Sequence, residues 1–107
     1  MVHSLNKGKN GERELSHFLH EHGFPARRGQ QHSGGADSPD VICEGLDDIH
    51  FECKRVERGA LEAWMAQAKR DCGTRIPVVA HRRNRGQWVA SLPLEDFLKL
   101  LKQRTEW

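Results

Sequence analysis

The sequence predicts an α/β fold in which a mixed β-sheet is flanked by helices. Two patterns indicate it: apolar residues recur at helical spacing in three segments, and short β-branched or alternating runs occupy five others. The order is helix, three strands, helix, two strands, helix. Because a helix separates the third predicted strand from the fourth, we expect a crossover connection there and a sheet covered on its faces.

The first predicted helix begins near Asn10, whose side chain can cap a helix N-terminus. Its inward positions recur at helical spacing: Leu15, Phe18, Leu19 and His22. Gly23 followed by Phe24 is typical of a helix C-terminus with a hydrophobic contact behind it. Residues 25–29 then form a short predicted strand.

The middle of the chain predicts a loop followed by a β-hairpin. Residues 30–39 are polar and rich in Gly and Ser, which favours a loop. Two strand-like runs follow at 40–43 and 49–56, joined by a turn at 45–48. We interpret these two runs as the arms of a hairpin.

The second half of the chain predicts a helix, two strands and a closing helix. The helix over residues 60–72 carries one apolar stripe, made of Leu61, Trp64, Met65 and Ala68. A dense β-branched run at 76–81 predicts a buried strand, and 87–92 predicts its neighbour. Pro93 stands in the first turn of the closing helix, whose apolar face is Leu94, Phe97, Leu98, Leu100 and Leu101.

Length and composition fit a single domain, residues 1–107, with 36% hydrophobic and 30% charged residues. No apolar run approaches the roughly 18 residues of a transmembrane helix, and residues 1–7 contain no signal-peptide core. We therefore expect a cytoplasmic protein without a membrane partner. The three cysteines form no CxxC pair, which argues against a disulfide framework and against a cysteine zinc site: Cys43, Cys53 and Cys72.

The net charge of +2 excludes no class of partner, but the distribution of charge is informative. Lys and Arg occur in local groups, at 7–9, 27–28, 54–55, 69–70 and 82–85. Asp and Glu gather at 12–21 and 37–57. Basic groups around a carboxylate-rich region suit a protein that binds phosphates and holds a cation, while ordinary solvated charge is the alternative for any single group.

The segment with the most chemical content combines Asp40 with Glu52 and Lys54. Pro39-Asp40 is followed by eleven residues and then by Glu52-Cys53-Lys54. Because strand side chains alternate between faces, Glu52 and Lys54 share one face of their strand. The apolar residues of both hairpin strands fall on the opposite face, which indicates that this opposite face packs the core: Val41, Cys43, Phe51 and Cys53.

Two carboxylates and a lysine on one sheet face suit phosphodiester hydrolysis. That reaction needs the phosphate charge neutralised, a water deprotonated and the leaving oxygen stabilised, and one or two Mg²⁺ or Mn²⁺ ions supply much of this. Asp40 and Glu52 would bind the metal, with the backbone carbonyl of Cys53 as a further ligand. Lys54 would orient the attacking water and stabilise the developing negative charge.

Further motifs accompany this segment between residues 7 and 92. They are Lys7-Gly8, Gly11-Glu12-Arg13-Glu14-Leu15, Gly23-Phe24, Arg28, Ser33-Gly34-Gly35, Pro39-Asp40-Val41-Ile42 and Phe51-Glu52-Cys53-Lys54. On these residues the chain resembles the PD-(D/E)xK nuclease superfamily and, within it, the archaeal-type Holliday junction resolvases. The predicted order of elements agrees with the restriction-endonuclease-like core that this resemblance implies.

The resemblance implies a metal pocket of Glu12, Asp40 and Glu52, with Lys54 catalytic and Ser33 near the scissile phosphate. It also implies a homodimer that places two nicks across a four-way DNA junction. Paired symmetric cuts need two active sites related by a two-fold axis, which a single domain of this size obtains by dimerising.

A second set of residues is predicted to contact DNA. Phosphate contacts are expected from basic side chains and should make binding strongly salt-dependent: Lys7, Lys9, Arg28 and Arg55. Gln67 can reach the site from the second helix, although a solvated glutamine is an equal alternative. The turn with Arg82, Arg83 and Arg85 either contacts phosphates or is solvated, and the sequence leaves both interpretations open.

Several residues have a plainer interpretation beside the functional one. Glu12 could only favour the helix N-terminus through the helix dipole, and Ser33 could only help to form its loop. His50 shares the strand face of Glu52 and is interpreted as a residue at the rim of the site. The tryptophans Trp64 and Trp88 are interpreted as core or interface anchors before base-stacking platforms.

The sequence supports three functional hypotheses. The first is an Mg²⁺- or Mn²⁺-dependent endonuclease acting on branched DNA such as Holliday junctions. The second is a nicking, repair or restriction-type nuclease of the same superfamily, acting on duplex or flap DNA. The third is a DNA-binding module that keeps the fold without turnover, against which the intact carboxylate and lysine set argues.

Overall fold

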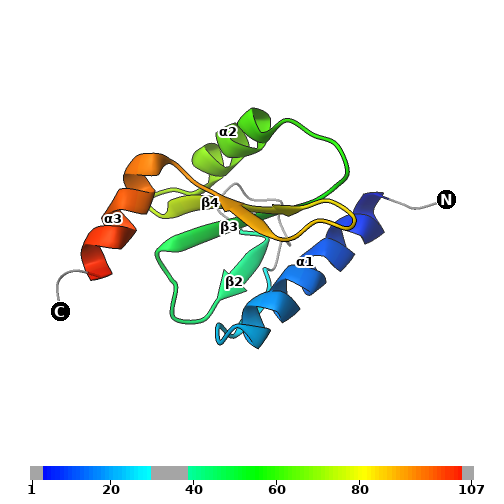
Figure 1. The fold of residues 1–107 in the computed structure, drawn as a ribbon, viewed down its shortest axis with the longest axis horizontal. Helices are drawn as coiled ribbons and strands as arrows, with labels where there is room; N and C mark the ends of the chain where they lie inside the picture. The colour runs from blue at the N-terminus through cyan, green and yellow to red at the C-terminus, as the bar shows by residue number, and fades with distance from the viewer. Residues whose placement is uncertain (1–3, 30–38, 105–107) are drawn as a thin grey trace.

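The computed structural model describes residues 4–29 and 39–104, and a five-stranded mixed sheet lies between helices at its centre (Figure 1). In chain order the elements are α1 (Ser4–Glu21), β1 (Ala26–Arg28), β2 (Val41–Cys43), β3 (Ile49–Arg55), α2 (Leu61–Asp71), β4 (Ile76–Arg82), β5 (Val89–Ser91) and α3 (Leu94–Arg104). This order and the mixed sheet confirm the predicted α/β fold.

The strands lie in the sheet in their chain order, β1-β2-β3-β4-β5. β3 and β4 pair in parallel through the crossover helix α2, and every other neighbouring pair is antiparallel. The predicted β2–β3 hairpin is therefore confirmed. In its turn Gly45 has φ 86°, a left-handed conformation that glycine adopts without steric cost.

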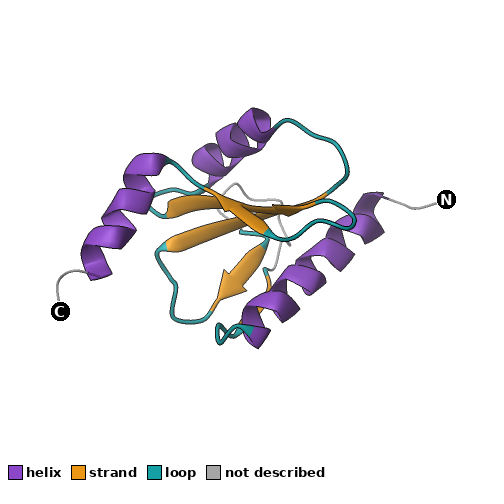
Figure 2. Ribbon diagram, in the orientation of Figure 1, coloured by secondary structure: helices purple, strands orange, loops and turns teal. Residues whose placement is uncertain are grey.

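α1 and α2 cover opposite faces of the sheet (Figure 2). α1 lies on β1, β2 and β3, so closely that a Cβ atom at Gly11 would lie 2.6 Å from the Cβ atom of Arg55. α2 lies on β3 and β4, where Gln67 contacts Lys54. Because Lys54 and Arg55 are consecutive strand residues, their side chains point to opposite faces.

The hydrophobic core lies between α1 and the sheet. Its buried members come from α1, β2, β3 and β4: Leu15, Val41, Cys43, Phe51, Val78 and Ala80. Burying one side chain such as that of Leu15 contributes about 1.5–3 kcal/mol to folding. The predicted packing face of the hairpin is therefore confirmed, and so is the burial of the 76–81 strand.

Some element boundaries and faces differ from the prediction. α1 begins at Ser4 and runs through Asn10, so Asn10 is not its N-cap. No proline interrupts residues 4–10, and each residue added to a helix gains a hydrogen bond, so the helix extends past the predicted start. β5 is shorter than the predicted 87–92 strand.

The apolar stripes of the two later helices are less buried than expected. In α2 only Ala68 is buried, and in α3, whose eleven residues are all described, no residue is buried. α3 instead lies at one end of the molecule (Figure 1). None of the helices in the described ranges has the length and hydrophobicity needed to cross a membrane.

Candidate active site

β3 presents Glu52 and Lys54 on the face that α2 covers. Glu52 is only 3% exposed, and Lys54 is half-buried. The Nζ atom of Lys54 donates a hydrogen bond of 3.1 Å to Oε1 of Gln67 on α2. The glutamine therefore reaches Lys54 and fixes where its ammonium group lies.

Asp40 stands directly before β2 and is held against β3 by two hydrogen bonds. Its backbone N–H donates to the carbonyl of Phe51 at 2.9 Å. Its Oδ2 atom accepts the backbone N–H of Cys53 at 2.8 Å. Because these contacts flank Glu52 along β3, the hairpin brings the two carboxylates of the motif together.

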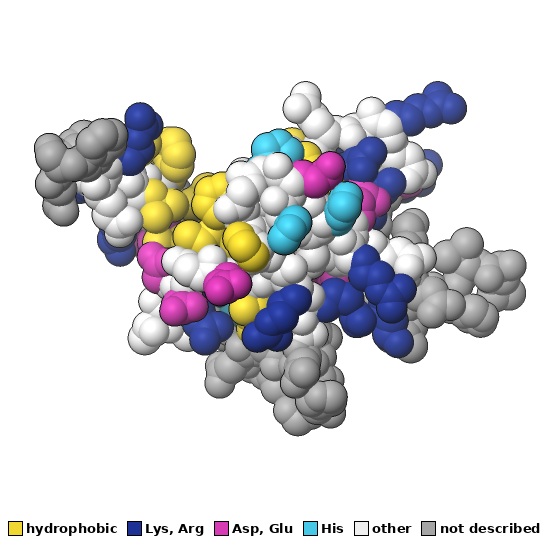
Figure 3. Space-filling view, turned by 90° about the horizontal axis from the view of Figure 1, so that it is seen from below, with side chains coloured by type: hydrophobic (Ala, Val, Ile, Leu, Met, Phe, Trp, Pro, Cys, Tyr) yellow, Lys and Arg dark blue, Asp and Glu magenta, His cyan; other side chains and the backbone are white. Residues whose placement is uncertain are grey.

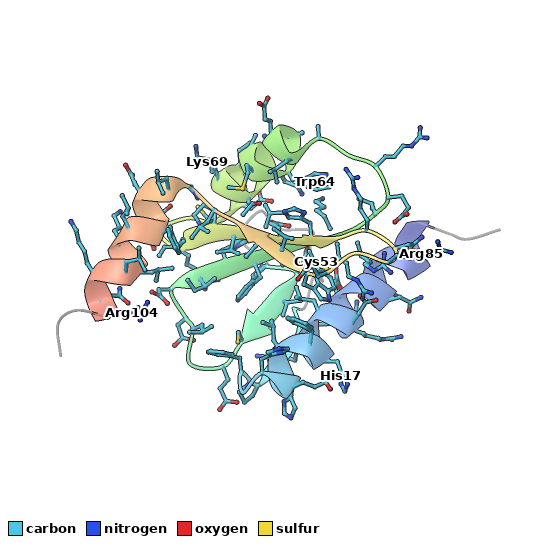
Figure 4. All side chains as sticks on the ribbon, in the orientation of Figure 1. His17, Cys53, Trp64, Lys69, Arg85 and Arg104 are labelled. Atoms are coloured by element: carbon cyan, nitrogen blue, oxygen red, sulfur yellow. The ribbon has the colours of Figure 1, made fainter. Side chains whose placement is uncertain are left out.

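The hydrogen bond between the Cys53 N–H and Asp40 also shows on which side of β3 the Cys53 carbonyl lies. The N–H and C=O groups of one strand residue point to the same side of the strand. Since the N–H of Cys53 points to Asp40, its carbonyl points toward this edge and away from β4. The side chain of Cys53 lies instead between the sheet and α1 (Figure 4).

The Cys53 thiol does not contribute a charged ligand. Burial raises its pKa to about 12, with further increases from the negative charges of Asp40, Glu12 and Glu14. A thiol with such a pKa stays protonated at neutral pH and is a poor metal ligand. The backbone carbonyl is the atom of this residue that suits a hard cation.

Glu12 lies on α1, close enough to Asp40 for the two charges to interact. Gly11 allows the helix backbone to approach β3, because any larger residue there would collide with Arg55. Oε1 of Glu12 accepts a hydrogen bond of 3.0 Å from Nε of Arg28 on β1. Burial raises the pKa of Glu12; the Arg28 hydrogen bond lowers it, and the charge of Asp40 raises it again.

Gly29 and Pro39 lie against each other next to Asp40. The N–H of Gly29 donates to the carbonyl of Asp40 at 2.9 Å, and a Cβ atom at Gly29 would lie 2.0 Å from the Pro39 carbonyl oxygen. Glycine is therefore required at this close approach. Ser33, which the sequence predicts to act near the scissile phosphate, lies outside the described residues.

Glu52 is a carboxylate in an unfavourable position for negative charge. Burial raises its pKa, a hydrogen bond from His50 lowers it, and the charge of Asp40 raises it further. Glu12 and Glu52 thus both sense the negative charge of Asp40. A divalent cation between these oxygens would relieve the repulsion and favour the ionised carboxylates.

The donor atoms fit a magnesium-like ion better than a transition metal. Among residues 4–29 and 39–104, no three His, Cys, Asp or Glu side chains lie together as a group that could hold a metal ion, so Glu12 does not join Asp40 and Glu52 in one three-carboxylate ligand set. Mg²⁺ is usually held by one or two carboxylates and several waters, so it does not require such a cluster. Asp40, Glu52 and the Cys53 carbonyl supply hard oxygens of the required kind.

The structure corrects the interpretation of His50. It is fully buried on the α2 face, where its Nε2 atom lies 2.9 Å from Oε1 of Glu52, and it is not a rim residue. The signal in the sequence was its position two residues before Glu52 on the same strand face. Its burial could not be seen from the sequence because it depends on how α2 lies over the sheet.

The predicted DNA-contacting residues lie in different surroundings. Lys9 is exposed on α1, while the side chain of Lys7 lies outside the described part. Arg28 holds Glu12, as described above. The guanidinium of Arg55 contacts Glu14 and, at 2.9 Å, the Oδ1 atom of Asn84 on the α1 side of the sheet. Their contacts with DNA stay predictions.

A second ionic cluster, which the sequence did not reveal, closes the α1 side of the sheet. Glu14 accepts hydrogen bonds from both Arg55 and Arg82, and Arg82 also donates to the carbonyl of Gly86 at 2.7 Å. Arg82 thus has partners within the chain, while a phosphate contact from this turn stays a prediction. Arg55 and Arg82 lie 41 and 68 residues from Glu14 in the sequence, so no local pattern marks the cluster.

The comparison with known families supports the same identification as the site geometry. The family model described as archaeal Holliday junction resolvase (hjc) matches residues 3–106, nearly the whole chain. No individual curated protein matches the chain. The family lies within the PD-(D/E)xK superfamily of nucleases, as the motif around Asp40, Glu52 and Lys54 predicts. The chain belongs to the archaeal Holliday junction resolvase family.

Proposed function

We propose that this resolvase-family nuclease is a divalent-metal-dependent endonuclease that cuts four-way DNA junctions at the pocket formed by Asp40, Glu52 and Lys54. The observation that carries the proposal is the hydrogen bond from the Cys53 N–H to Asp40, which holds the carboxylate of Asp40 beside Glu52 in the middle of β3. Glu12 on α1 is a further carboxylate whose pKa the charge of Asp40 raises, which supports a place for it near the ion.

The residues have separate tasks in this mechanism. Asp40 and Glu52, with the Cys53 carbonyl and Glu12 beside them, would hold one or two Mg²⁺ or Mn²⁺ ions. When bound, the metal neutralises phosphate charge and lowers the pKa of a water. Lys54, held by Gln67, lies beside this pocket and orients the attacking water. Its ammonium also stabilises the negative charge that develops on the phosphate.

Cleavage of a labelled four-way junction tests the proposal. The wild type is incubated with junction, duplex and flap DNA in Mg²⁺, in Mn²⁺ and in EDTA. We expect symmetric paired nicks in the junction, dependent on the metal. Glu52→Gln should lower the rate by about 10³-fold or more, since metal ions contribute several kcal/mol to transition-state stabilisation. Glu62→Gln, an exposed glutamate on α2, is the matched control and should cleave normally.

The same panel separates the alternatives. Faster cleavage of duplex or flap DNA than of junctions would favour a nicking or repair nuclease. Junction binding without any cleavage, unchanged by Glu52→Gln, would favour an inert binding module. Equal rates in EDTA and Mg²⁺ would contradict the metal requirement.

We also propose that two copies of the chain pair through α3. This helix exposes an apolar face, with Leu94 69% exposed and Phe97 and Leu98 nearly half-exposed. Figure 3 shows hydrophobic side chains gathered toward the end of the molecule where α3 lies. The first turn of α3 is acidic, with Glu95 and Asp96, and its last turn carries two basic residues, Lys102 and Arg104.

This charge arrangement fits a second copy of the same helix. When two identical helices pack antiparallel about a two-fold axis, the acidic turn of each lies beside the basic turn of the other. Light scattering should show a dimer for the wild type and a monomer for Phe97→Glu. Leu61→Glu, which changes an exposed leucine on α2, should remain dimeric. A wild type that stays monomeric on a junction would contradict the homodimer.

A further inference from the structure

His50 and Glu52 form a buried hydrogen-bonded pair directly behind the proposed metal pocket. The Nε2 atom of His50 lies 2.9 Å from Oε1 of Glu52, and the two side chains are 0% and 4% exposed. Both residues belong to β3 and, two positions apart, point to the same face. α2 covers this face, and the buried Val79 of β4 lies beside Glu52 in the sheet.

The hydrogen bond has a defined direction. An ionised carboxylate, the form that binds a cation, only accepts hydrogen bonds, so in that form of Glu52 the Nε2 atom of His50 carries the hydrogen and donates it. Oε1 of Glu52 is occupied by this contact, which fixes the rotation of the carboxyl group. Glu52 also shares a side-chain hydrogen bond with Asp40, a contact that a cation bound between the two carboxylates would replace.

Packing alone does not explain a histidine at this position. Within the described residues, the Nδ1 atom of His50 is buried and has no hydrogen-bond partner. Burying a polar atom without a partner is unfavourable, and a leucine of similar size would fill the space without that cost. The gain from His50 therefore lies in its contact with Glu52.

We propose that His50 is a positioning residue that orients the Glu52 carboxylate for a divalent cation. The inference rests on the proposed metal-dependent function, because it assigns a role to a neighbour of a metal ligand. Hydrogen-bonding partners of metal ligands fix ligand orientation, and losing such a partner typically weakens metal affinity about 10–100-fold. His50 itself does not touch the metal or the DNA in this role.

Metal titration of the full chain by calorimetry tests the role without relying on cleavage. Mn²⁺ and Mg²⁺ are titrated into the wild type, His50→Leu, His50→Gln and His50→Asn, and each melting temperature is measured alongside. The glutamine amide nitrogen reaches the place of Nε2, whereas the asparagine amide lies near the place of Nδ1. His20→Leu, which changes an exposed histidine on α1, is the control.

We expect His50→Leu and His50→Asn to bind the metal about 10–100-fold more weakly. His50→Gln should bind nearly as tightly as the wild type, because it keeps the donor to Glu52. This difference between His50→Gln and His50→Asn separates positioning from packing. A packing role would make metal affinity follow the melting temperature, whichever nitrogen the variant restores. Should His50→Leu fail to fold, the metal affinities of His50→Gln and His50→Asn are compared to test whether the donor to Glu52 matters.

Two results would overturn the inference. One is wild-type metal affinity in His50→Leu or His50→Asn. The other is an equal loss in all three variants that follows their melting temperatures, which is the behaviour of a packing residue. A wild type that binds neither metal would instead contradict the proposed function itself, so the two failures are distinguishable.

Discussion

Two charged clusters lie against the sheet, and the two are built differently. On the α1 side, Glu14 accepts hydrogen bonds from Arg55 and Arg82, so one carboxylate meets two guanidinium groups. At the edge where β2 begins, Glu12 and Glu52 have raised pKa values, because both are buried and both face the charge of Asp40. The first cluster pairs one carboxylate with two guanidinium groups, whereas the second contains the carboxylates of Glu12, Asp40 and Glu52, of which Glu12 is paired with Arg28.

This difference indicates where the chemistry lies. Surface ion pairs such as those of Glu14 serve structure and contribute little free energy each. Carboxylates that are desolvated together are unfavourable in the chain alone, and such groups gather at functional sites. A cation that binds there gains affinity from the same repulsion. The sheet therefore separates an ion-paired cluster from the proposed metal site.

The largest effect on cleavage predicted from this comparison comes from Lys54, which β3 presents on the α2 side of the sheet. Lys54→Ala should lower the junction-cleavage rate about 10²–10³-fold, because it removes a cation that stabilises the developing charge. Its folding should be nearly unchanged, since Lys54 is half-buried and contacts only Gln67 among the described hydrogen bonds. Single-turnover kinetics with saturating protein measure the rate.

The matched control is Lys69→Ala, which removes an exposed lysine from α2. It should cleave at the wild-type rate. Equal losses in Lys54→Ala and Lys69→Ala would show that general positive charge, and not the position beside Glu52, accounts for the effect.

A substitution in the hydrophobic core should lower the stability of the fold without changing the metal affinity of the site. Leu15→Ala removes a fully buried side chain between α1 and the sheet and should lower the free energy of unfolding by about 2–5 kcal/mol. Urea unfolding followed by circular dichroism measures the loss. Under conditions where the variant is folded, its metal affinity should remain close to that of the wild type; a loss as large as that of Glu52→Gln would contradict the separation of core and site.

The sequence predicts the features of this molecule that depend on local periods. The alternation in β3 predicts that Phe51 packs the core and that Glu52 and Lys54 share the other face, and the turn around Gly45 predicts the hairpin that aligns Asp40. Both patterns repeat within a few residues, so one segment suffices to read them. The element order follows in the same way.

Features that depend on distant contacts could not be predicted. The burial of His50 results from α2 lying over β3, and the Glu14 cluster joins α1 with the ends of two strands. The exposure of the apolar face of α3 also depends on where the helix is placed. An amphipathic pattern predicts a face that packs, but it does not say whether the partner belongs to the same chain.

The raised pKa of Glu52 should make the stability of the fold depend on pH. The folded-state pKa of Glu52 is raised above its ordinary value of 4.5, chiefly by burial. Between those two values the folded chain binds more protons than the unfolded chain, so the free energy of unfolding falls as pH rises through this window. In EDTA, the wild type should therefore lose stability relative to Glu52→Gln as pH increases above about 4.5.

Urea unfolding at a series of pH values measures this difference. Below the ordinary value the two stability curves should run parallel, because Glu52 is protonated in both states. Added Mg²⁺ should restore stability to the wild type at neutral pH and have less effect on Glu52→Gln, since a ligand that binds the folded state stabilises it. A stability difference that grows as pH falls would have the wrong sign.

The smallest effect should come from the ion-paired cluster. Glu14→Gln leaves Arg55 and Arg82 without their shared carboxylate, and we expect a loss of at most about 1 kcal/mol in the free energy of unfolding, because the group is partly exposed. The loss should shrink in high salt, which screens such pairs. Metal affinity measured by calorimetry should stay unchanged, because Glu14 faces the guanidinium groups. If Glu14→Gln weakened metal binding as much as Glu12→Gln does, the two clusters would form one electrostatic unit, and the division drawn between them would fail.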